Sequence, residues 1–228
     1  MTTLTPSDAV ALVRKNLDEQ DPNGSVMYDP GNTYGDNASL DGTIKRFLPE
    51  AINAVHLGAP VQLLEGESVV ASSPSITSDG VLSFSLPAES KYLRLVAFQA
   101  ADSSIVVTDP IPEAGAEGRK QLNKYIRGRY DRPRLVLLQG RHTEPAFKYY
   151  TLNPAGSGFD GYVAAPSTAI GQLAIIKEQF YAAAAVSYNI SRRLRQNIID
   201  CLTAMVMETY SDQRAQSYYQ KANSYPAI

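Results

Sequence analysis

Residues 39–57 read SLDGTIKRFLPEAINAVHL, and this stretch decides the fold of the N-terminal part of the chain. Its apolar side chains recur every three or four residues, the spacing of an amphipathic helix. This apolar stripe consists of Leu40, Ile44, Phe47, Leu48, Ala51, Ile52 and Val55. Pro49 lies inside the stripe and has no backbone N–H, so we expect either a kink or two short helices. The following Gly58-Ala-Pro predicts where the helix ends.

Helical patterns also occur at both ends of the sequence. Thr5, Pro6 and Asp8 predict a capped helix start, because a threonine N-cap, a proline at the first position and an acidic third residue satisfy the free N–H groups. Near the other end, an apolar stripe predicts one long helix over about 192–222. Segment 171–190 is interpreted as helix, although Ile175-Ile176 and Val186-Ser-Tyr also suit a strand.

The middle of the chain has a different period. Short β-branched or aromatic runs alternate with Gly, Ser, Pro and Asp, which predicts a small antiparallel sheet, sandwich or barrel. The expected strands are 61–64, 69–71, 81–86, 92–99, 105–108, 134–139 and 146–152, with a helix at 113–127. The sequence therefore predicts an α+β protein: a helical bundle from the N- and C-terminal helices with an inserted antiparallel β-rich region. We expect one integrated subunit built from segments 1–58, 59–170 and 171–228.

Composition narrows the class of protein. In 228 residues, 21 Lys and Arg oppose 23 Asp and Glu, and 44% of residues are hydrophobic, which favours a folded chain over a disordered one. A single cysteine, Cys201, excludes an intramolecular disulfide. No apolar run is long enough for a membrane span, and the N-terminus lacks a basic leader, so we expect a soluble protein of a reducing cytoplasm with no membrane partner.

Few residues suggest catalysis or cofactor binding. Gly156 to Gly161 matches G-x-G-x-x-G, but Pro166 follows so closely that no phosphate-binding helix is expected after it. His56, His142 and Cys201 are too few and too scattered for a zinc site. The loop from Asp29 lacks the glutamate that closes a calcium loop. We therefore predict no catalytic residue, no cofactor and no metal, and we interpret Cys201 as a buried apolar residue.

Positive charge is concentrated in one window. Residues 119–148 carry nine basic and two acidic side chains, a net of +7 against −9 for the rest of the chain, with tyrosines interleaved. Such a stretch suits either docking onto an acidic protein surface or contact with nucleic acid phosphates. We favour the protein interface, and predict that its contact residues include Arg127, Arg129, Arg132, Arg134, Tyr218, Tyr219 and Tyr225. Arg192-Arg193-Leu-Arg195 is a second cluster, at a helix start where cations are unfavourable, which suggests a negatively charged partner.

Three stretches together resemble one protein family. Residues 39–60, the segment LSFSLPAESKYLRLVAFQ at 82–99, and IIDCLTAMVMET at 198–209 are similar to the second helix, central strand pair and last helix of head–tail adaptor proteins. These are the neck ring proteins of crAss-like and podovirus-like phages of gut Bacteroidetes. The chain departs from that pattern at Ala100-Ala-Asp, where the family has a tryptophan, and in its 153–171 loop.

The resemblance implies a structural virion protein without enzymatic activity. In that family about twelve copies form a ring beneath the portal, contact neighbouring neck and tail rings, and surround the DNA passage without reading its sequence. It implies assembly in the host cytoplasm and a final location in the virion neck. Two alternatives stay open: a nucleic-acid-binding module using 119–148, and a hydrolase, for which the sequence offers no recognisable acid–base pair.

Overall fold

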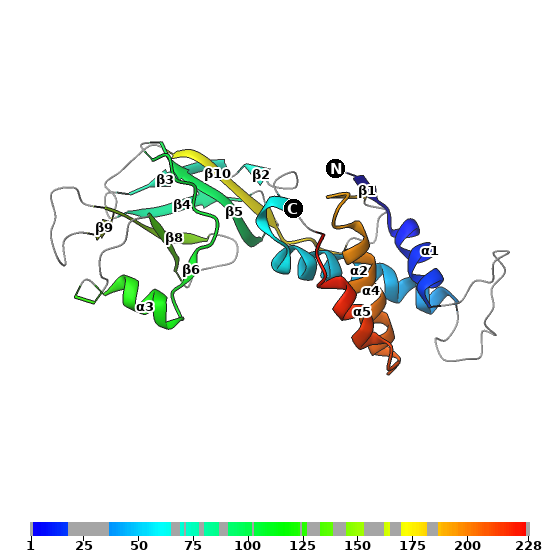
Figure 1. Ribbon diagram of the computed structural model, residues 1–228. Helices are drawn as coiled ribbons and strands as arrows, with labels where there is room; N and C mark the ends of the chain where they lie inside the picture. Colours follow the sequence, from blue (N-terminus) through cyan, green and yellow to red (C-terminus); the bar gives the residue numbers. More distant parts are fainter. Residues whose placement is uncertain are drawn as a thin grey trace. The chain divides into compact units, whose positions relative to one another are not determined.

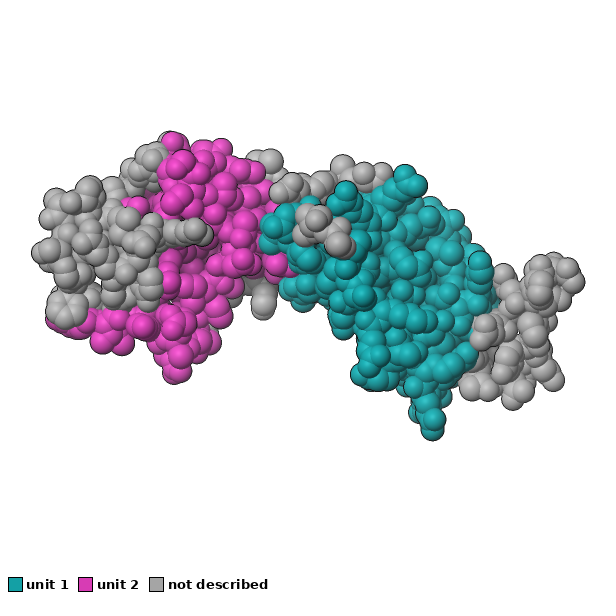
Figure 2. Space-filling model, in the orientation of Figure 1, with its two compact units in different colours: residues 1–67, 179–228 teal, residues 68–178 magenta. Residues whose placement is uncertain are grey.

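The computed structural model describes residues 2–17, 37–64, 69–70, 72–77, 80–86, 91–101, 103–123, 125–126, 133–138, 145–152, 162–164, 170–181 and 187–226. Its contacts divide the chain into two units, coloured separately in Figure 2. Unit 1 consists of residues 1–67 and 179–228, so it is assembled from both ends of the sequence. Unit 2 consists of the intervening residues 68–178.

Unit 1 contains most of the helical residues. Its elements are β1 (Thr2–Leu4), α1 (Pro6–Asn16), α2 (Asn37–Gly58), the 3₁₀ helix η1 (Val61–Leu63), β11 (Tyr188–Ile190), α4 (Arg195–Thr209) and α5 (Ala215–Ala222). Helix α2 packs against α1 and α4, and α4 also contacts α1 and α5 (Figure 1). Strands β1 and β11 form an antiparallel pair that joins residues from the two ends of the sequence.

The two N-terminal helices follow their sequence patterns. The predicted cap of α1 is confirmed: the Asp8 N–H donates to Thr5 Oγ1 at 3.1 Å, and the Thr5 N–H donates to Asp8 Oδ2 at 3.3 Å. Helix α2 continues through Pro49, so the alternative of two short helices is wrong. Packing of its apolar stripe offsets the one backbone hydrogen bond that proline removes. Five residues of that stripe are at most 1% exposed: Leu40, Ile44, Leu48, Ala51 and Ile52.

The C-terminal part of the chain corrects two predictions. The single helix expected over 192–222 is broken between α4 and α5, where Ser211 has a φ of 59° and Asp212 Oδ1 accepts the Arg214 N–H at 2.9 Å. The helix expected over 171–190 is wrong, because residues 170–177 are strand and Tyr188–Ile190 is β11. Adjacent Ile175 and Ile176 are both buried, and a strand buried on both faces has no alternating pattern to reveal it.

Unit 2 contains sheet and one described helix. Its elements are β2 (Val69–Val70), β3 (Ser72–Ile76), β4 (Val81–Ser85), β5 (Tyr92–Ala100), β6 (Ile111–Pro112), α3 (Ala116–Leu122), β7 (Arg134–Leu137), β8 (Ala146–Leu152), β9 (Tyr162–Ala164) and β10 (Ile170–Lys177). Among the described residues, one sheet has the order β2-β10-β5 and a larger one the order β3-β4-β8-β7-β6, with β9 paired to β8. All these pairs are antiparallel except β6 with β7.

Several predicted elements in unit 2 and just before it need adjustment. Residues 61–64 were expected as strand, and this prediction is wrong. Val61–Leu63 is a 3₁₀ helix that begins directly after Pro60. The 105–108 run contributes only a bridge between Val107 and Phe98. The helix expected over 113–127 is limited to α3, whereas the strand predicted over 146–152 coincides with β8.

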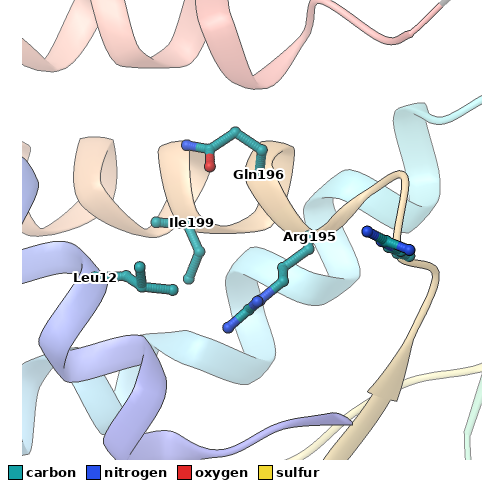
Figure 3. Close-up of a pocket in the computed structure, with 5 residues that line it drawn as sticks. Leu12, Arg195, Gln196 and Ile199 are labelled. Carbon is teal, nitrogen blue, oxygen red and sulfur yellow. The ribbon is translucent and has the colours of Figure 1, made fainter. Parts of the chain in front are cut away.

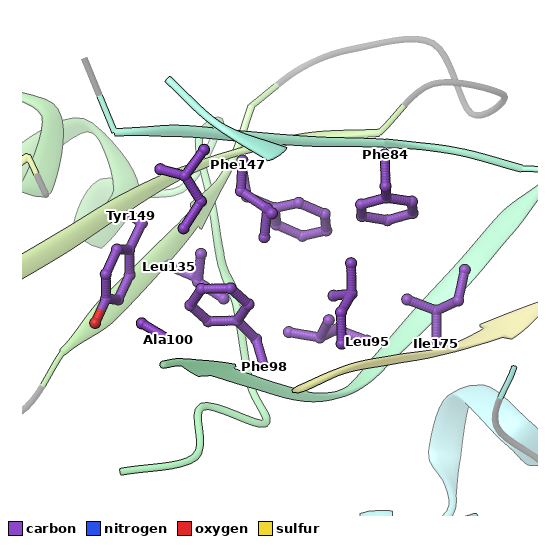
Figure 4. Packing of buried hydrophobic residues seen from close by; sticks show 11 residues of the cluster. Phe84, Leu95, Phe98, Ala100, Leu135, Phe147, Tyr149 and Ile175 are labelled. Carbon is purple, nitrogen blue, oxygen red and sulfur yellow. The ribbon is translucent and has the colours of Figure 1, made fainter. Parts of the chain in front are cut away.

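A hydrophobic core holds unit 2 together. Side chains from β4, β5, β7, β8 and β10 meet in it, as the close-up in Figure 4 shows. The rings of Phe98 and Tyr149 lie edge to face with their centroids 5.1 Å apart, and those of Phe84 and Phe147 are stacked at 6.0 Å. The molecule therefore has the mixed α+β composition expected from the sequence.

Candidate functional site

One exposed surface in unit 2 combines positive charge with large apolar side chains. We call it the α3 surface and define it as Arg119, Lys120, Tyr125 and Ile126. Arg119 and Lys120 are exposed in the last turns of α3, and the following Tyr125 and Ile126 are 63% and 56% exposed. Large apolar side chains beside cations are characteristic of protein interfaces.

Asn123 shapes the turn that carries the two apolar residues of the α3 surface. Its side-chain Oδ1 accepts the Tyr125 N–H at 3.0 Å, and its carbonyl accepts the Ile126 N–H at 3.2 Å. The turn thereby places Tyr125 and Ile126 next to the end of α3, so the apolar and the basic parts of the surface adjoin.

The start of α3 is held against the sheet of unit 2. The Glu113 N–H donates to the Leu137 carbonyl at 3.0 Å, which ties the segment to β7. Gly118 is buried so closely against Pro112 that a Cβ there would lie 2.1 Å from the Pro112 carbonyl oxygen. Glycine at this position is therefore required for the close approach.

The predicted arginine contacts fall partly outside the described structure. Arg127, Arg129 and Arg132 lie outside the described residues, as do His142 and the 156–161 glycine motif. Arg134 lies in β7, partly buried, with its Nη1 3.9 Å from Glu117 Oε2. Its role as an interface residue stays a prediction.

The three predicted interface tyrosines make hydrogen bonds within unit 1. The Tyr218 hydroxyl donates to the Asn16 carbonyl at 3.3 Å, and the Tyr225 hydroxyl donates to the Val55 carbonyl at 3.4 Å. The Tyr219 hydroxyl donates to Glu208 Oε2 at 2.6 Å, and burial together with that carboxylate raises the pKa of Tyr219. These bonds attach α5 and the residues after it to the other helices, and contact with another molecule stays a prediction.

A second candidate site is a pocket between α1 and α4, which we call the α1/α4 pocket. It has a volume of about 260 Å³ and is lined by Leu12, Arg192, Arg195, Gln196 and Ile199 (Figure 3). Leu12 and Ile199 face each other across it, and Arg195 extends from the first turn of α4 toward α1. Sequence reasoning singled out the arginine cluster, but not Leu12, because nothing local indicates that α1 packs against α4.

Polar groups near this pocket are partly engaged. Gln196 Nε2 donates to Asp200 Oδ1 at 2.9 Å, and burial raises the pKa of Asp200. Asp8 is exposed, and its pKa is lowered chiefly by its hydrogen bonds to Thr5 and to a smaller extent by the positive charge of Arg195. Asp200 thus accepts a hydrogen bond from Gln196, and Asp8 accepts one from the Thr5 N–H.

Cys201 and His56 are both buried in unit 1. Burial raises the pKa of the Cys201 thiol to about 11, which keeps it in the unreactive thiol form, as its place in the apolar stripe predicts. His56 is buried in the last turn of α2. Within the residues described, no three His, Cys, Asp or Glu side chains gather as a metal site would require. No described helix has the length and hydropathy of a membrane span.

No protein-family model matches the chain, and no curated protein matches it either.

Proposed function

We propose that this protein is a structural subunit of a tailed-phage neck, where copies of it form a ring that connects the portal to the tail. The observation that carries the proposal is the α3 surface, on which exposed cations adjoin two large apolar side chains. Its positive charge lies in the +7 window, and the rest of the chain carries the complementary −9. Opposite charges on one chain favour head-to-tail association of identical copies, which closes into a ring when the rotation allows it.

The proposed subunit uses its two units differently. The helices of unit 1 constitute the bundle that packs against neighbouring copies, and unit 2 carries the α3 surface to the adjoining subunit. The partners are copies of the same chain in a ring of about twelve, the portal protein, and adjacent neck and tail rings. DNA passes through the central channel without sequence-specific contact. This assignment also draws on the resemblance of residues 39–60, 82–99 and 198–209 to neck ring proteins.

The proposal is tested by assembly. Native mass spectrometry and negative-stain imaging of the purified protein, alone and with a portal, are expected to show closed rings. Reversing both charges with Arg119→Glu and Lys120→Glu is expected to abolish the rings. The matched control is Arg119→Lys with Lys120→Arg, which keeps both exposed positive charges at the same positions of α3 and is expected to leave assembly intact. Absence of the chain from purified virions of the phage that encodes it would contradict the proposal.

A second candidate function is nucleic-acid binding through residues 119–148. Tyr125, which is 63% exposed beside Arg119 and Lys120, favours it, because bases stack on exposed tyrosines between cations. This function predicts binding to duplex DNA that weakens steeply with salt and falls when Arg127, Arg129 and Arg132 are replaced by alanine. No binding to duplex DNA at low salt would exclude it.

A further inference from the structure

The α1/α4 pocket has a charged side and an apolar side. Arg192 and Arg195 both line it, whereas the adjacent Arg193 does not. Leu12 from α1 and Ile199 from α4 supply the apolar side and face each other in Figure 3. A group that fills this space contacts hydrocarbon and guanidinium at once.

The guanidinium of Arg195 has hydrogen-bonding capacity left over. Its Nε atom is buried and has no hydrogen-bond partner within the part of the chain that the structure describes. A buried donor without an acceptor is unfavourable by itself, and a ligand oxygen removes that penalty. Asp8 contributes only a weak, solvent-exposed attraction to Arg195, because its carboxylate caps α1 through the Thr5 N–H.

The positive charges at the start of α4 also favour an anion in the pocket. The first turn of a helix carries a partial positive charge, so Arg195 in that turn and Arg192 just before it are unfavourable unless negative charge is added. Among the described residues no side chain caps this helix, whose N-cap residue is the apolar Leu194. An anion in the pocket relieves both the repulsion and the missing acceptor.

The apolar side of the pocket selects the kind of anion. A bare phosphate leaves the partly exposed side chain of Leu12 in contact with water, whereas a glutamate or aspartate side chain brings methylene groups to it together with the carboxylate. Arginine also binds carboxylates through paired N–H groups. We propose that the α1/α4 pocket is a carboxylate-binding site that receives an acidic side chain from a peptide segment of another protein molecule. This inference stands on unit 1 alone and does not depend on ring formation.

The test is a titration of the full chain with a peptide, followed by NMR. The probe is the blocked peptide acetyl-Ala-Glu-Leu-Glu-Ala-amide, compared with the same peptide carrying glutamine in place of both glutamates. Chemical-shift changes are expected at the methyl groups of Leu12 and Ile199 with the glutamate peptide only. Added salt is expected to weaken the binding, because the contact is ionic.

Arginine variants establish which side chains bind the probe. Arg195→Gln and Arg192→Gln are each expected to weaken the affinity for the glutamate peptide about tenfold or more, since each removes a charge-assisted contact. Arg193→Gln is the matched control, because it removes the same charge one residue away from the lining, and it is expected to change the affinity less than about twofold. Arg192 is exposed, so its variant tests the site even where Arg195→Gln fails to fold.

Three results would overturn the proposal. The first is no shift of the Leu12 and Ile199 methyl groups with the glutamate peptide. The second is an equal loss of affinity in the Arg193→Gln control, which means that only net charge matters. The third is a stronger response of the same methyl groups to a short DNA duplex than to the peptide, which assigns the pocket to phosphate.

Discussion

The side-chain amide of Asn53 holds the main chain of Gln179 by both of its polar groups. The Gln179 N–H donates to Asn53 Oδ1 at 2.8 Å, and Asn53 Nδ2 donates to the Gln179 carbonyl at 2.9 Å. Asn53 lies in α2, and Gln179 is the first residue of unit 1 after the chain has completed unit 2. The Asn53 side chain thus satisfies both backbone polar groups of Gln179 and attaches the chain to α2 where it re-enters unit 1.

Replacing Asn53 by alanine should destabilise unit 1. Both bonds are lost, and the partly buried N–H and carbonyl of Gln179 lose their partners, so we expect a loss of about 2 kcal/mol in the free energy of unfolding. Chemical denaturation followed by circular dichroism measures it. The control is Asn189→Ala, on the exposed side of β11, with an expected change within about 0.5 kcal/mol. Equal effects of the two substitutions would show that the Asn53 contact contributes no stability.

Replacing Gly118 by alanine should destabilise unit 2. The new Cβ would lie 2.1 Å from the Pro112 carbonyl oxygen and 2.8 Å from Glu113 Cα, and both are backbone atoms that cannot rotate away. We expect a loss of roughly 3 kcal/mol, at the upper end for overpacking. Gly42→Ala, in α2, is the matched control: nothing lies within 4 Å of its Cβ, and alanine favours helix by about 0.5–1 kcal/mol. Thermal unfolding should therefore move in opposite directions for the two variants.

Removing the Tyr219 hydroxyl should loosen α5 from α4. Tyr219→Phe keeps the ring and deletes the 2.6 Å hydrogen bond to Glu208 Oε2, for an expected loss of about 1 kcal/mol. Amide hydrogen exchange of residues 215–222 should rise in this variant. Tyr181→Phe, at a side chain that is 53% exposed, is expected to leave that exchange unchanged. Unaltered exchange in Tyr219→Phe would mean that apolar packing alone holds α5.

The Cys201 thiol should make stability fall at high pH. Burial raises its pKa from an ordinary value of 9.0 to about 11, so the folded chain holds this proton more tightly than the unfolded chain does. The stabilisation is therefore complete below pH 9 and is lost as the pH rises from there through about 11. The free energy of unfolding should decrease more steeply over this range in the natural protein than in Cys201→Ala. Parallel curves for the two proteins would contradict the assignment.

Elements set by local chemistry were predictable from the sequence. The Thr5–Asp8 cap depends on residues three positions apart, and the stripe of α2 depends on a regular spacing that needs no distant partner. Strand β8 was recovered with its bounds because it is short, β-rich and flanked by turn residues. The mixed α+β composition followed from these patterns.

Elements set by distant contacts were not predictable. Strand β10 pairs with both β2 and β5, so its Ile175 and Ile176 are buried on opposite faces and carry no period that distinguishes strand from helix. The break between α4 and α5 depends on Ser211 at a φ of 59°, a conformation that serine adopts only when its surroundings impose it.

In the candidate sites too, features set by local sequence were predictable and features set by distant contacts were not. Arg192 and Arg195 were recognisable as cations at an unfavourable position, but the pocket exists only because α1 places Leu12 opposite Ile199. Likewise, Tyr218 was singled out as a contact residue, but nothing in its local sequence indicates that its hydroxyl donates to the Asn16 carbonyl. The spacing of residues along the sequence does not indicate which distant residues contact each other in the fold.

The pairing of β1 with β11 has a consequence for biosynthesis. Thr2 pairs with Ile190, so residues 2–4 leave the ribosome long before the strand that pairs with them is synthesised. Residues 68–178 form a contiguous unit and carry no such delay. We therefore expect unit 2 to fold first during translation, while the nascent α1 and α2 expose their apolar stripes until α4 is synthesised and rely on chaperones in the interval.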